Sequence, residues 1–142
     1  MAAHRLFLAA SDFSEDAQHA LERAALLARE QQVRLKLLHV VSEPSLQTLR
    51  GMLGIPMDIE ARVLEQAALR LDESAADLAR RTGVEVEVEV RTGDIAGEIL
   101  AEAEQADLLV MGARGSSGFL DAFVGSISER LLRRCRRPVL VV

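Results

Sequence analysis

Short apolar runs alternate along the chain with longer stretches in which apolar residues recur every three or four positions. Mainly apolar runs cover residues 5–10, 33–41, 107–111 and 138–142, a run of alternating valine and glutamate covers residues 84–90, and together they predict five β-strands. The recurring positions between them predict four helices, because one face of a helix repeats every 3.6 residues. Two such faces consist of Ala17, Ala20, Leu21, Ala24, Leu27 and Ala28, and of Ile59, Val63, Ala67, Leu71, Ala75 and Leu78.

Residues 42–57 interrupt this alternation. They hold two of the three prolines and two of the nine glycines, and this composition predicts a loop or a mobile flap. We expect the next helix to span residues 58–81 and the last helix to run from Ile127 to about residue 136.

The strict alternation predicts a single α/β domain over residues 1–142, in which helical crossovers join parallel strands. After their first, charged residue the segments "RLFLAA" and "DLLVM" are continuously apolar, which is typical of central strands that are covered on both faces. "VEVEVEV" has a valine face and a glutamate face, so we expect an edge strand whose glutamates face solvent. The last run, "PVLVV", has no charge and would make a poor exposed edge, so we expect something to cover it.

A glycine-rich loop, residues 111–128, follows the fourth strand. If the first and fourth strands are central neighbours, the winding reverses there, and ligands bind beyond the carboxyl ends of those strands. Backbone amides in glycine-rich turns and at helix amino ends bind phosphate, and Ser126, Ser128 and Arg114 add donors. The alternative is a structural turn, in which the glycines only end a strand and Ser126 only caps the helix.

Known catalytic motifs are missing. Lys36 is the one lysine and no P-loop pattern exists, nor does the dinucleotide G-x-G-x-x-G fingerprint. The residues suggest no Ser-His-Asp or Cys-His arrangement, so we predict no catalytic group. Three histidines and the single Cys135 do not form a zinc pattern. Asp12 also resembles the phospho-acceptor of a receiver domain, but the lysine which that fold needs near its last strand is absent.

Charge and hydropathy narrow the class of protein. A net charge of −5 argues against a general nucleic-acid binder and against an anionic membrane surface. No apolar run approaches the length of a membrane span, and residues 1–16 lack the arrangement of a secretory signal peptide. We therefore expect a cytoplasmic protein. Five arginines between residues 130 and 137 form a basic patch, either a solvated face or a contact for a partner protein.

The glycines carry a more specific signal. Gly112-x-x-Gly115, nine residues and then Gly125-Ser126 resemble the G-x2-G-x9-G-[ST] signature of universal stress proteins of the ATP-binding type. "FLAASDFSEDAQHALERAALLA", "LKLLHVV", "GDIAGEILAEAEQADLLVMGARG" and "RRPVLVV" are similar to other segments of that family. The resemblance implies a Rossmann-like (adenine nucleotide alpha-hydrolase-like) open sheet of order 3-2-1-4-5 with helices on both faces. It also implies a homodimer through the last strand, which begins at Pro138 and ends at Val142.

The resemblance further implies the site residues. Ala10, Ser11 and Asp12 would lie near the ribose and phosphates, with Asp12 as a ribose or metal contact or, alternatively, a simple helix cap. The backbone of Val40 would meet the adenine edge and Met111 would flank the base. Gly112, Arg114 and Gly115 would border ribose and phosphates, and Gly125, Ser126, Ile127 and Ser128 would cradle the phosphate chain.

The function that follows is an ATP-binding regulatory protein of the stress response. The sequence does not separate ATP from ADP or AMP, nor does it decide whether Mg²⁺ is bound. Two alternatives stay open: a slow ATPase or phosphotransferase, and a nucleotide-independent interaction dimer. The stress, the pathway and any partner protein are not readable from the residues.

Overall fold

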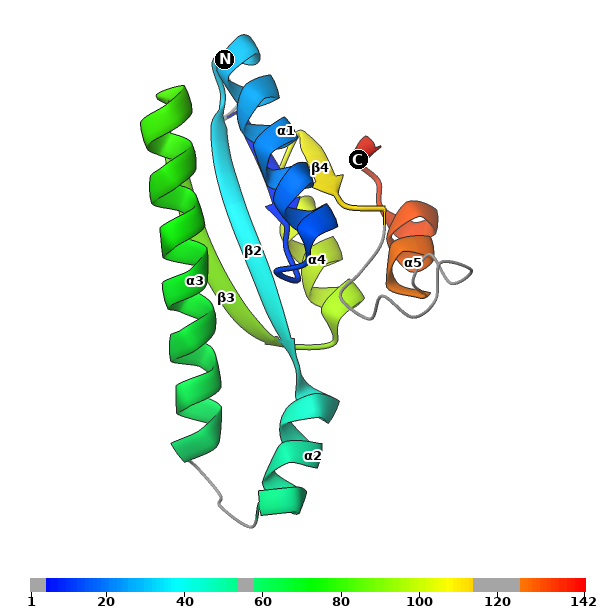
Figure 1. Cartoon of the computed structure of the whole chain (residues 1–142). Coiled ribbons are helices and arrows are strands. Elements are labelled where there is room, and N and C mark those ends of the chain that lie inside the picture. The colour runs from blue at the N-terminus through cyan, green and yellow to red at the C-terminus, as the bar shows by residue number, and fades with distance from the viewer. Residues whose placement is uncertain (1–4, 54–57, 114–125) are drawn as a thin grey trace.

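The computed structural model describes residues 5–53, 58–113 and 126–142. Strands and helices alternate along the described chain (Figure 1). In order, the elements are β1 (Leu6–Ala10), α1 (Glu15–Gln31), β2 (Arg34–Ser42), α2 (Glu43–Leu53), α3 (Asp58–Thr82), β3 (Val86–Gly93), α4 (Ile95–Ala103), β4 (Leu108–Met111), α5 (Ser126–Arg134) and β5 (Val139–Val141).

The five strands form one parallel sheet in the order β3-β2-β1-β4-β5, which confirms the predicted architecture. The central strand β1 pairs with β2 on one side and β4 on the other, so Phe7 lies between Leu35 and Leu108. The strands β3 and β5 are the two edges of the sheet, which confirms the edge position predicted for β3.

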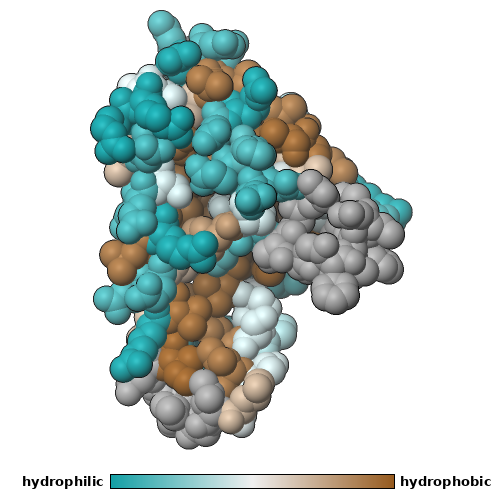
Figure 2. Space-filling model, viewed as in Figure 1, coloured by the Kyte–Doolittle hydropathy of each residue, from teal (hydrophilic) through white to brown (hydrophobic). Residues whose placement is uncertain are grey.

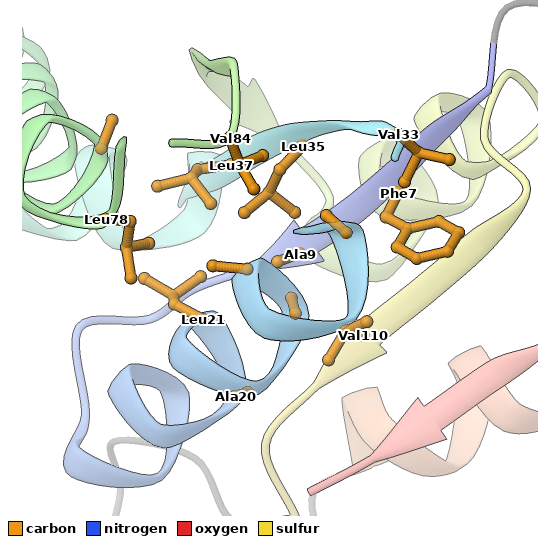
Figure 3. Packing of buried hydrophobic residues seen from close by; sticks show 14 of the residues in the cluster. Phe7, Ala9, Ala20, Leu21, Val33, Leu35, Leu37, Leu78, Val84 and Val110 are labelled. Carbon is orange, nitrogen blue, oxygen red and sulfur yellow. The ribbon is translucent and has the colours of Figure 1, made fainter. Parts of the chain in front are cut away.

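Helices cover both faces of the sheet. On one face, α1 and α3 pack over a cluster that contains Phe7, Leu21, Leu37 and Val110 (Figure 3). On the other face, α4 and α5 pack over a cluster that contains Leu8 and Leu109. Successive side chains of a strand point to opposite faces, so the apolar runs supply both clusters at once.

The prediction of a loop over residues 42–57 is wrong for its greater part, because α2 occupies residues 43–53. Pro44 falls in the first helical turn, where a missing amide hydrogen costs nothing. Leu46 anchors the helix, since its buried side chain packs with Val41 and Ala67. Arg50 forms ion pairs with Glu43, at 3.9 Å, and with Glu60 of α3.

The glutamate face of β3 is not simply a solvent face. Glu87 is exposed and forms an ion pair with Arg34. Glu89 is half-buried and forms an ion pair with Lys36 at 2.6 Å. Glu102 of α4 approaches the same face, is only 4% exposed and pairs with both Lys36 and Arg91. A charged cluster, Lys36, Glu89, Arg91 and Glu102, therefore joins α4 to β2 and β3.

Burial alone would lower the pKa of Lys36, but the hydrogen bonds and charges of Glu102 and Glu89 outweigh it and raise this pKa above its ordinary value. The hydrogen bond from Lys36, partly offset by burial, lowers the pKa of Glu89. Both groups thus carry their full charge at neutral pH. Among the described residues, no helix is long and apolar enough to span a bilayer.

Candidate functional site

The sheet reverses its winding direction at β1. From β1 the chain moves to β2 and β3 on one side, and afterwards to β4 and β5 on the other (Figure 1). The segments that follow β1 and β4 therefore diverge at the carboxyl edge of the sheet, the place where open α/β sheets bind ligands. Ser11 continues the line of β1, because its amide donates to Leu38 O at 2.9 Å.

Side chains of the segment after β1 hold its turn together. Ser11 Oγ accepts from the amide of Phe13 at 3.1 Å, and Asp12 Oδ1 accepts from the amide of Ser14 at 3.0 Å. Ser14 is the N-cap of α1, since its side chain accepts from the Ala17 amide. The reading of Asp12 as the helix cap is therefore wrong: its carboxylate closes the turn before the cap.

Phe13 takes an unusual backbone conformation in this turn. Its φ is 67°, in the left-handed region that bulky residues seldom adopt. Its ring lies 4.3 Å from the ring of His39, and the guanidinium of Arg70 lies 4.1 Å from the Phe13 centroid. Sequence reasoning missed this three-residue stack, because Arg70 comes from α3 and a backbone angle leaves no mark in a hydropathy pattern.

His39 also bonds to the backbone of the segment that follows β1. Its Nδ1 donates to Ser11 O at 2.7 Å, a bond that orients the imidazole. Burial lowers the pKa of His39 below its ordinary 6.5, and the charge of Arg70 lowers it further. The hydrogen bond to Ser11 and the charge of Asp12 raise this pKa but do not outweigh burial. The side chain is therefore neutral at pH 7.

Acidification from about pH 7 to about pH 5.5 is expected to destabilise the protein through His39. The unfolded chain, in which this pKa is ordinary, binds the proton first, so unfolding becomes more favourable as the pH falls through 6.5. Urea unfolding at the two pH values measures the effect. A His39→Gln variant is expected to lose part of this pH dependence; an unchanged dependence would contradict the assignment.

Val40 and Met111 lie at the predicted edge but point into the core. Both side chains are buried in the cluster under α4 and α5. The side chains of Val40 and Met111 are therefore both engaged in packing. Ala10, at the end of β1, packs against the same cluster.

Gly112 follows β4 where the first turn of α1 passes very close. A Cβ atom at this position would lie 2.9 Å from the backbone carbon of Asp16 and 3.1 Å from the amide nitrogen of Ala17. The glycine is therefore required for packing, independently of any ligand. The next residue, Ala113, donates its amide to Val142 O at 3.0 Å.

The amino end of α5 lies at the same edge, because a crossover helix runs antiparallel to the parallel strands that it joins. Ser126 begins the helix, Ile127 packs against the core cluster and Ser128 is half-buried. The first amides of a helix have no partner within it and favour an anion. Arg130 ties α5 to the N-cap of α4 through Asp94, at 3.2 Å.

The structure thus brings residues 10–12, 40, 111–112 and 126–128 to one edge of the sheet. Arg114, Gly115 and Gly125 lie outside the described residues. Within the described ranges, no three His, Cys, Asp or Glu side chains form a group that could hold a metal ion.

Comparison with known proteins gives a consistent result. The family model described as "Universal stress protein family" matches residues 4–142 of this chain. The universal stress protein YxiE of Bacillus subtilis is 34% identical over 142 residues, covering 95% of this chain and 96% of its own. The solved structure of MJ0577, a universal stress protein of Methanocaldococcus jannaschii, superposes with a TM-score of 0.82 at 25% identity and covers 99% of this chain and 96% of its own.

Two more distant structures contain nucleotides. One universal stress protein, in complex with cAMP, has a TM-score of 0.64 at 21% identity and covers 99% and 98% of the two chains. Another, from Archaeoglobus fulgidus in complex with dAMP, has a TM-score of 0.69 at 20% identity with the same coverage. At these identities the likeness concerns the fold. The match over residues 4–142, together with the 34% identity to YxiE, shows that this chain belongs to the universal stress protein family.

Proposed function

We propose that this protein binds ATP at the carboxyl edge of its sheet and acts as a nucleotide-dependent regulatory protein of the cytoplasm. One observation carries the proposal: the amino end of α5 lies at the point where β1 and β4 end and the winding reverses. The cAMP and dAMP complexes of two proteins with this fold support an adenine nucleotide as the ligand class.

Each part of the nucleotide has a suitable neighbour. The backbone of Val40 suits the adenine edge, and Asp12 suits the ribose hydroxyls. The amides of residues 126–128, with Arg114, Gly115 and Gly125, suit the phosphates. The protein as a whole carries a net charge of −5 and repels anions. The proposed anion site therefore depends on the dipole of α5 and on backbone amides rather than on the net charge. If Mg²⁺ is bound, the phosphates supply most of its ligands, with Asp12 as the protein carboxylate.

We further propose a homodimer through residues 138–142. Among residues 5–53, 58–113 and 126–142, β5 pairs with β4 alone, so its other edge can pair with another strand. Figure 2 shows hydrophobic residues gathered at the margin where the C-terminus lies in Figure 1. Antiparallel pairing with the β5 of a second copy would cover this edge.

Native mass spectrometry of the protein as purified, followed by titration with ATP in the presence and absence of Mg²⁺, tests both proposals. We expect a dimer that binds one ATP per chain. A dimer that ignores millimolar ATP would overturn the nucleotide site, and a monomer that binds ATP would overturn the dimer alone.

Replacement of Ser128 by alanine is expected to weaken ATP binding by about tenfold, the effect of losing one hydrogen bond to a charged group. The matched control is Ser45→Ala on α2, an exposed serine outside the site. Isothermal titration calorimetry at equal protein concentration compares the two. Equal affinity of both variants for ATP would argue against a phosphate contact by Ser128.

A further inference from the structure

Phe13 keeps a backbone conformation that its own residue type disfavours. Its φ of 67° lies in the left-handed region, where glycine fits without strain and bulky residues do not. Among the described residues, Gln32 is the other non-glycine residue with a positive φ, and it is the C-cap of α1, where this conformation commonly ends a helix. Phe13 precedes α1 instead. Strained residues of this kind persist only where surrounding contacts hold them, and they gather at functional sites.

Contacts from α3 and β2 hold Phe13 through its ring. The guanidinium of Arg70, an exposed residue of α3, lies 4.1 Å from the ring centroid and forms a cation–π contact. The ring of His39, from β2, lies 4.3 Å from the same ring. Glycine would relieve the backbone strain but would remove both contacts. The phenyl ring therefore ties the backbone angle of Phe13 to a helix more than fifty residues away along the chain.

The backbone of Phe13 in turn orients the carboxylate of Asp12. Asp12 Oδ1 accepts from the amide of Ser14 at 3.0 Å, so this hydrogen bond spans Phe13 and depends on its φ. Ser11 Oγ accepts from the amide of Phe13 at 3.1 Å within the same turn. If Phe13 left the left-handed region, the bond between Asp12 and Ser14 would break and the carboxylate would turn elsewhere.

We propose that Arg70 is a positioning residue of the nucleotide site, which holds the turn of residues 11–14 so that the Asp12 carboxylate points at the ribose. This role rests on the proposed binding of ATP. Arg70 acts through the Phe13 ring and not by touching the nucleotide. A cation–π contact at an exposed site shifts an equilibrium by about two- to fivefold, which sets the expected effect on ATP affinity. By linkage, bound ATP strengthens the contact between α3 and the turn by the same factor.

The test compares Arg70→Gln with Arg62→Gln by isothermal titration calorimetry with ATP. Both arginines are exposed on α3, so the control removes the same charge from the same helix. We expect Arg70→Gln to weaken ATP binding by about two- to fivefold and Arg62→Gln to leave it unchanged. Arg70→Lys keeps a cation beside the ring and is expected to recover most of the affinity. Far-UV circular dichroism confirms the fold of each variant.

Two double variants test how Arg70 acts. Phe13→Leu removes the aromatic ring, and Asp12→Ala removes the carboxylate. In either background we expect Arg70→Gln to have no further effect on ATP affinity, because the contact or its target is already absent. An equal loss in all backgrounds would overturn the positioning role, as would equal losses from Arg70→Gln and Arg62→Gln or an Arg70→Gln variant with unchanged affinity. An unsubstituted protein that does not bind ATP would overturn the nucleotide site itself, and this role with it.

Discussion

Replacement of Glu102 by alanine is expected to lower the free energy of unfolding by about 3 kcal/mol. Glu102 is 4% exposed and pairs with Lys36 of β2 and Arg91 of β3. Its removal leaves the ammonium of Lys36, whose side chain is only 15% exposed, with Glu89 as its one carboxylate partner in the described part of the chain. A buried charge that loses a partner keeps its desolvation cost, so the loss exceeds that of an exposed ion pair.

Urea unfolding followed by circular dichroism measures this loss. The matched control is the double variant Lys36→Met with Glu102→Leu, which removes both charges and leaves apolar side chains between α4 and the sheet. Arg91 keeps Glu89 and, at 3.4 Å, Glu98. We expect the double variant to recover most of the stability that Glu102→Ala loses. A double variant as unstable as Glu102→Ala would mean that the cluster acts through something other than charge.

Gly112→Ala is expected to cost about 2 kcal/mol of stability, within the range for an added group in a tightly packed place. The new methyl carbon would lie 2.9 Å from the backbone of Asp16, so either the end of β4 or the first turn of α1 must move. Neither is a flexible side-chain end that can turn aside. Because both segments border the proposed nucleotide site, ATP affinity is expected to fall together with stability.

Gly51→Ala supplies the control for Gly112→Ala. Gly51 is in α2, and a Cβ there meets nothing within 4 Å. Alanine in a helix is favoured over glycine by up to about 1 kcal/mol, so this variant should be as stable as the starting protein or more stable. If Gly112→Ala is equally harmless in thermal unfolding, the close approach of α1 and β4 does not restrict position 112.

Composition predicted the places of three strands, because burial leaves a direct mark on it, whereas the full order came from the family resemblance. Uniform apolar runs in β1 and β4 identify central strands, and the alternation in β3 identifies an edge. The helix α2 was missed because prolines and glycines suggested a loop, whereas Pro44 occupies the one turn that tolerates it. What decides α2 is the burial of Leu46 against Ala67, a contact between residues 21 positions apart that no local pattern contains.

For the candidate site, the sequence indicated a position at the carboxyl edge of the sheet, and the binding role of its residues stays a prediction. The resemblance gave the edge of the sheet and the residues along it. It did not show that Met111 packs into the core, that Ser14 rather than Asp12 caps α1, or that α1 presses against Gly112. The packing of Met111 and the close approach of α1 to Gly112 depend on how segments distant in the sequence meet, whereas Asp12 and Ser14 are both residue types that cap helices. The stack of Phe13, His39 and Arg70 also joins residues from separate segments.

The charged cluster at Lys36 also determines the amine chemistry of the folded chain. Residues 1–142 contain one lysine, and its ammonium is held between two carboxylates with its pKa raised. Only the free amine is a nucleophile, so the raised pKa and the low exposure of Lys36, 15%, reduce its reactivity toward reagents and enzymes that acylate lysine. Acylation at Lys36 is therefore expected to be slower in the folded protein than in the unfolded chain, where neither the pairing carboxylates nor burial protects the amine.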